Sequence, residues 1–145
     1  MSDSSDSGQW NRVSPRALAE FEAICPAVEE EVLRLCMASD DPQAIMGKDA
    51  EGMVRRGLGF VSGMLRSAFA FDADGVVDDE LEWGRIRLPV YGVSPRMVLA
   101  NLERYSSALE ERLPKATFAE LRPHLERMVS RQRRIARRGR LNRDP

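Results

Sequence analysis

The chain has 145 residues, of which 43% are hydrophobic and 31% charged, which indicates one globular domain with its own core. Two cysteines and one histidine are too few for a disulfide framework or for the common zinc sites, which need four Cys or His ligands. No apolar run reaches the ~20 residues needed to cross a bilayer, and the first residues are polar and acidic. We therefore expect a cytoplasmic protein without a membrane span, a signal peptide or a metal site.

Charge is distributed unevenly along the chain. Residues 127–145 hold eight arginines and one acid, a charge of +7, which leaves −8 for residues 1–126. The simplest interpretation is a solvated helix end whose cations favour the negative end of the helix dipole. The alternatives are a contact for polyanions or for an acidic face of a partner subunit. Nucleic acid is the least favoured partner, because this stretch has no aromatic residue to stack on bases.

The composition divides the chain into three parts. Residues 1–12 are rich in Ser and Asp and offer only Trp10 as an apolar group, so we expect them to be disordered. A helical domain is predicted over 13–138, because apolar residues recur there with helical spacing and strand signals are almost absent. Residues 139–145 form the basic tail.

The first predicted helix begins at Ser14, an N-cap residue that is followed by Pro15 at the first helical position. Pro26 lies inside the pattern and should kink the helix or divide it in two, because proline lacks a backbone N–H and crowds the preceding turn. The apolar face of this helix consists of Leu18, Phe21, Cys25, Val28, Val32 and Cys36.

A second helix is predicted over residues 49–71, and it contains four glycines. Each glycine costs ~1 kcal/mol relative to alanine in a helix interior, so packing must compensate for it. Gly59, Gly63 and Ser67 follow one another at four-residue steps and place small residues on one face. We expect another helix of the same chain to approach this face closely; a dimer interface is the alternative.

The segment after this helix, DADGVVDDE, resembles a calcium loop only in part. Gly75 occupies its fourth position, whereas an EF-hand needs glycine at the sixth and an acid at the twelfth. Asp79 followed by Glu82 instead predicts a capping box that opens a third helix, which ends near Pro89.

Two long helices complete the predicted fold. Ser94 and Pro95 open the fourth, which ends near Pro114, and Thr117 with Glu120 predicts a capping box for the fifth. We expect an all-α bundle of five to seven helices whose last two are antiparallel and pack over the glycine-bearing helix. Their predicted buried residues are Val98, Leu102, Tyr105 and Leu109 in the fourth helix, and Phe118, Leu121, Leu125, Met128 and Ile135 in the fifth.

The residues that most often carry chemistry have structural explanations. His124 lies at the edge of the last apolar face, where a partly buried histidine with a hydrogen-bond partner is expected and a haem ligand is less favoured. Cys25 and Cys36 are eleven residues apart, ~16 Å along a straight helix, which is too far for a disulfide. We expect both to be small buried apolar residues. No catalytic arrangement is evident, so we do not expect an enzyme.

A more suggestive cluster lies on the third helix and just after it: Asp79, Trp83, Arg85, Arg87 and Tyr91. An acid, an aromatic ring and two guanidinium groups suit a flat, conjugated ligand that carries carboxylates. The carboxylate would pair with ring N–H groups, the arginines with the ligand's acids, and the indole would stack. In the structural alternative, Asp79 caps the helix, Trp83 belongs to the core and the arginines are solvated.

The stretch DELEWGRIRLPVYGV resembles the chromophore helix of phycobiliproteins, in which an Asp precedes an aromatic residue and an Arg; Asp79, Trp83 and Arg85 match this pattern. The helix order over residues 13–138 is similar to that of globins without a haem histidine, among them the bilin biosynthesis-associated globins. Phycobiliproteins attach their bilin through a cysteine just before this aspartate, whereas here these positions hold Val76, Val77 and Asp78. The resemblance thus implies a globin-like fold with a kinked N-terminal helix pair, a homodimer, and non-covalent binding of a bilin.

Two functions follow as expectations. The first is a non-enzymatic, non-haem globin-like protein that binds or escorts a linear tetrapyrrole, or a related tetrapyrrole, beside a bilin-pathway enzyme or a signalling protein. The second is a cofactor-free dimeric regulatory module of the sensor-globin type, suggested by the glycine face and the basic tail. A protein that binds polyanions through the arginine-rich stretch is a third possibility.

Overall fold

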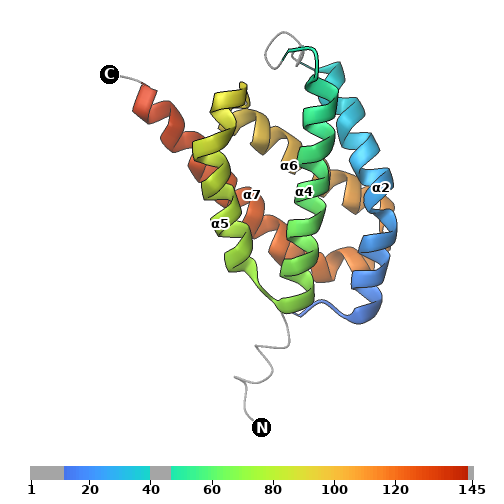
Figure 1. The fold of residues 1–145 in the computed structure, drawn as a ribbon. Helices are drawn as coiled ribbons and strands as arrows, with labels where there is room; N and C mark the ends of the chain where they lie inside the picture. Colours follow the sequence, from blue (N-terminus) through green and yellow to red (C-terminus); the bar gives the residue numbers. More distant parts are fainter. Residues whose placement is uncertain (1–11, 40–46, 144–145) are drawn as a thin grey trace.

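Figure 1 shows a computed structural model of the chain, which describes residues 12–39 and 47–143. All regular structure in these residues is helical, as the sequence predicts. The predicted disordered segment 1–12 lies, except for Arg12, outside the described residues. The elements are α2 (Pro15–Ala38), α4 (Ala50–Phe71), α5 (Asp74–Arg87), the 3-10 helix η1 (Leu88–Tyr91), α6 (Pro95–Arg112) and α7 (Lys115–Arg143).

Two helix starts agree with the predicted caps. The hydroxyl of Ser14 accepts a hydrogen bond from the Ala17 N–H at 3.1 Å, and that of Ser94 accepts one from the Met97 N–H at 3.2 Å. Each serine satisfies a backbone donor that the first helical turn leaves without a partner.

The two predicted capping boxes are wrong. Helix α5 begins at Asp74, so Asp79 lies inside the helix and caps nothing. Asp72 adopts the left-handed conformation (φ 52°) at the end of α4, which lets the chain turn at once into α5. Helix α7 begins at Lys115, and the hydroxyl of Thr117 donates to Glu20 of α2 instead of capping.

Pro26 does not divide the first helix. Helix α2 runs without interruption from Pro15 to Ala38, in place of the predicted helix pair. Pro26 is exposed, so its ring points away from the core. The helix therefore keeps one continuous buried face, with Phe21 and Val28 fully buried on either side of the proline.

The helices form a bundle in which α2 lies against both α4 and α6, while α5 connects α4 with α7 (Figure 1). Helices α6 and α7 pack along each other and are antiparallel, as predicted. Arg122 near the start of α7 pairs with Glu110 near the end of α6, and Gln132 bonds to Pro95 at the start of α6. Helix α4 packs mainly on α2 and α5 and touches α7 only slightly, so the terminal helices do not cover it as predicted.

The glycine face of α4 is not a close helix crossing. A Cβ atom built on Gly59 or Gly63 would meet no other atom within 4 Å. The small residues therefore make room for no helix among the residues that the structure describes. The buried face of α4 is formed instead by Ala50, Val54, Leu58, Ser62, Met64, Leu65, Ala68 and Phe69.

A hydrogen-bonded chain of side chains crosses the core from α6 to α2. Tyr105 is fully buried, and its hydroxyl lies 2.5 Å from the Ser62 hydroxyl and 3.6 Å from the Cys25 sulfur. Ser62 in turn donates to Glu29 at 2.6 Å. Each polar group in this series of hydrogen bonds has a partner, so burial of the Tyr105 phenol costs little free energy. The predicted core residues of the last helix, from Phe118 to Ile135, are buried around this centre.

Among the described residues, no helix is both long and apolar enough to cross a membrane.

Candidate ligand-binding pocket

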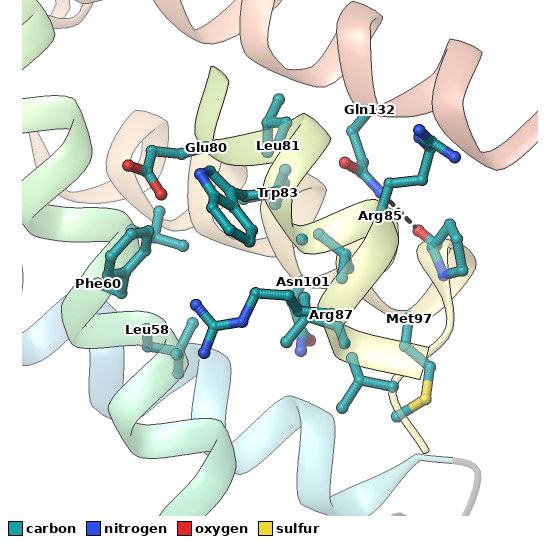
Figure 2. Close-up of a pocket in the computed structure, with 18 of the residues that line it drawn as sticks. Leu58, Phe60, Glu80, Leu81, Trp83, Arg85, Arg87, Met97, Asn101 and Gln132 are labelled. Carbon is teal, nitrogen blue, oxygen red and sulfur yellow. Dashed lines mark hydrogen bonds between the residues drawn. The ribbon is translucent and has the colours of Figure 1, made fainter. Parts of the chain in front are cut away.

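A cavity of about 620 Å³ lies between α4, α5, η1 and α6, with Gln132 of α7 at its edge (Figure 2). Its inner surface is mainly apolar and includes Leu58, Leu81, Leu102 and Val98. The volume falls within the range of about 300–1,000 Å³ that is typical of small-molecule sites, and a mainly apolar lining with few polar groups is typical as well.

Four of the five residues predicted from the sequence line this cavity. Trp83, Arg85, Arg87 and Tyr91 belong to its wall, whereas Asp79 does not. Successive residues of an α-helix are rotated by about 100° around its axis, so Asp79 points away from the side of α5 that lines the cavity. Asp79 is accordingly exposed.

Aromatic rings from three elements stand half-exposed at the cavity. Trp83 of α5 is 57% exposed, Phe60 of α4 56% and Tyr91 of η1 56%. Trp83 therefore does not belong to the core, contrary to the structural alternative, whereas Arg85 and Arg87 are exposed, as that alternative expected. The Arg87 guanidinium lies 5.4 Å from the centre of the Trp83 ring, and Figure 2 shows it directed toward Leu58 and Phe60. This cation–π contact holds one positive charge against the aromatic wall.

The two predicted arginines differ in their surroundings. The Arg85 guanidinium points toward α7, away from Trp83 (Figure 2), and its Nε pairs with Glu82 at 3.1 Å. Arg138 of α7 also pairs with Glu82 at 3.1 Å. Partial burial alone would raise the pKa of Glu82, but hydrogen bonds from Arg138 and Arg85 prevail and lower it. The charge of Arg85 is thus engaged, whereas that of Arg87 faces the cavity.

The acid beside the aromatic wall is Glu80, next to the predicted Asp79. Glu80 lines the cavity, and Figure 2 shows its carboxylate on the same side of Trp83 as Phe60. Phe60 and Arg56 of α4 also belong to the wall and were not predicted. Asp79 and Glu80 both lie one turn before Trp83, so the helical period alone could not choose between them, and α4 gave no signal for Phe60 or Arg56.

His124 lies away from this cavity. Its Nδ1 lies 2.9 Å from Asp74 Oδ1, so the predicted hydrogen-bond partner is confirmed, but the side chain is only 2% exposed and thus fully buried where partial burial was expected. Phe69 contacts the imidazole edge-on, with ring centres 5.4 Å apart. Cys25 and Cys36 are free and buried, as predicted, and burial raises the pKa of the Cys25 thiol.

Three arginines of the basic stretch pair with acids of the same chain. Arg127 pairs with Asp78 at 2.8 Å, and Arg133 pairs with Glu103 at 3.3 Å. Together with the Arg138 pair, these contacts fasten α7 to α5 and α6. Helix α7 also extends through Arg143 into the predicted tail 139–145. Acidic partners for these arginines, which were expected on a partner subunit as one alternative, are therefore present in the same chain.

In comparisons with known proteins, no family model, curated protein or solved structure matches the chain.

Proposed function

We propose that this chain is a non-enzymatic, non-haem, globin-like protein that holds a linear tetrapyrrole, or a related tetrapyrrole, non-covalently in the cavity between α4, α5, η1 and α6. The observation that carries the proposal is the combination of Trp83, Arg87 and Glu80 on one wall of an apolar cavity of about 620 Å³. An aromatic plane, a cation and an anion are thereby presented to the same ligand.

Each part of a bilin has a chemical counterpart in this wall. Its conjugated plane stacks on the indole of Trp83. This stacking contributes more binding free energy than burial of the same apolar surface alone. A propionate pairs with the guanidinium group of Arg87, because planar guanidinium suits carboxylate geometry. Arg56 also lines the cavity, but its guanidinium pairs with Asp49 at 3.2 Å. The pyrrole N–H groups of the bilin donate to the carboxylate of Glu80, which takes the role first assigned to Asp79. The apolar edges of the ligand pack on leucines such as Leu58 and Leu81.

Binding in this cavity is non-covalent. A bilin thioether needs a cysteine in the wall, and no cysteine lines the cavity. Cys25 and Cys36 are buried in α2. The proposal also assigns no axial ligand to His124, which packs against Asp74 and Phe69 and does not line the cavity.

An absorption titration tests this function. Biliverdin is added to the purified protein, with haem and a corrinoid titrated in parallel. The proposal predicts a saturable, shifted bilin band at one ligand per chain, and smaller changes for the two macrocycles, which cannot adapt their shape to the wall. Absence of a specific change with all three ligands would refute it.

A cofactor-free dimeric interaction module is the second candidate, and exposed apolar side chains favour it. Ile86 is 62% exposed and Val90 80%, and neither lines the cavity. The open glycine face of α4 offers a second flat surface, with room beside Gly59 and Gly63. A homodimer, or a complex with a bilin-pathway enzyme or signalling protein, would cover these surfaces. Light scattering at high protein concentration tests this second candidate, because the module must dimerise without any ligand, and a monomer would contradict it.

A further inference from the structure

A second group of chemistry-bearing side chains lies at the corner where α4 turns into α5, apart from the proposed binding cavity. Asp72 ends α4, Asp74 opens α5, and His124 comes from the middle of α7. Each contributes one potential ligand atom, and these three atoms all lie within 4.8 Å of one another.

We propose that Asp72, Asp74 and His124 form a binding site for a divalent first-row transition-metal ion such as Zn²⁺. Imidazole nitrogen suits Zn²⁺ and related ions, and carboxylate oxygens complete a mixed set of donors that these ions accept. Three protein ligands leave the remaining positions to water.

The distances are close to those of such a site. In tetrahedral geometry, bonds of about 2.0–2.2 Å to one ion place two neighbouring ligand atoms about 3.3–3.6 Å apart, slightly farther than in the present hydrogen-bonded pair. Nδ1 of His124 and Oδ1 of Asp74 are 2.9 Å apart. Asp72 is exposed, so its carboxylate can turn toward the pair without disturbing the core.

The surroundings distinguish this group from an ordinary ion pair. A bond between His124 and Asp74 explains two of the residues but leaves a second carboxylate beside them. Within the part of the chain that the structure describes, no side chain pairs with Asp72, and the nearby Arg127 pairs with Asp78 instead. The His124 side chain is 98% buried, since only 2% is exposed, and Phe69 fixes its ring. A rigid imidazole reduces the entropy that the ligand loses when an ion binds.

The expected consequence is a clamp between the α4–α5 corner and α7. Because an ion that binds only the folded chain stabilises it, thermal stability should rise with Zn²⁺ concentration. This site uses none of the residues of the proposed cavity, so the proposal of metal binding does not depend on tetrapyrrole binding.

The test uses protein without a polyhistidine tag. His124 is the only histidine, so the NMR signals of its imidazole C–H groups are assigned without ambiguity. Titration with Zn²⁺ should shift these signals saturably at one ion per chain. Asp72→Asn should weaken binding at least ~10-fold, the size that loss of even an outer-shell group produces. Asparagine accepts the left-handed backbone conformation at this position, so the fold should survive.

Asp79→Asn is the matched control, because it removes the same charge from an exposed residue of α5 and should leave the affinity unchanged. Two results would overturn the proposal: imidazole signals that do not move with Zn²⁺, or equal affinities for the wild type and Asp72→Asn. The second result would mean that Asp72 is not a ligand of the ion.

Discussion

Replacement of Trp83 by alanine should separate ligand binding from stability. Stacking on an aromatic ring contributes about 0.5–1.5 kcal/mol beyond burial, and loss of the ring also releases the Arg87 guanidinium from its place 5.4 Å from the ring centre. We therefore expect a loss of about 1–2 kcal/mol, which corresponds to ~5–30-fold weaker binding of biliverdin. Because Trp83 is 57% exposed, the free energy of unfolding should fall by much less than the about 3–5 kcal/mol typical of a buried Trp or Phe.

The assay is an absorption titration of each variant with biliverdin, together with denaturant unfolding of the unliganded protein. Ile86→Ala is the control, since Ile86 is an exposed apolar residue of the same helix that does not line the cavity. If Trp83→Ala and Ile86→Ala lower the affinity equally, or neither lowers it, the aromatic wall has no part in binding.

Two further predictions concern the bundle itself. Gly63→Ala should stabilise the monomer by up to ~1 kcal/mol in denaturant unfolding, because the added Cβ meets no atom within 4 Å; destabilisation would show that a partner packs on this face. Burial is the main cause that raises the pKa of both Tyr105 and Cys25, so the folded state prefers their neutral forms. Their contribution to stability is complete below the ordinary values of about 10 and 8.5 and is lost as the pH rises above them. The free energy of unfolding should therefore fall in this alkaline range, less steeply for Tyr105→Phe, and equal slopes for the two proteins would contradict this assignment.

Periodicity predicted the helices well because burial of an apolar face dominates helix stability. The faces that contain Phe21 and Leu121 are buried as expected. Local motifs were less dependable than periodicity. Serine followed by proline gave correct helix starts at Ser14 and Ser94, since proline cannot lie deeper in a helix without losing a bond. The Asp79 capping box failed because the preceding residues continue the helix and bury Val77.

The binding cavity could be predicted only in part. Trp83 and Arg87 were found because they are close in sequence on one short helix. Phe60 of α4 comes from another element, and its position depends on tertiary packing that no local pattern encodes. The group of Asp72, Asp74 and His124 was missed for the same reason, since its histidine comes from a distant helix. The glycine face shows the reverse error, because the spacing of Gly59 and Gly63 suggested a helix contact that the bundle does not make.

A comparison of Arg87→Ala with Arg85→Ala tests the central claim most directly. Both variants remove one arginine from α5, but the Arg87 guanidinium lies against Trp83, whereas Arg85 is paired with Glu82. Titrated with biliverdin, Arg87→Ala should bind at least ~10-fold more weakly than the wild type, because a charge-assisted bond of about 1.5–3 kcal/mol is lost, and Arg85→Ala should bind nearly as tightly as the wild type. Equal affinities for the two variants, or no binding to the wild type, would contradict the assignment of this cavity as a tetrapyrrole site.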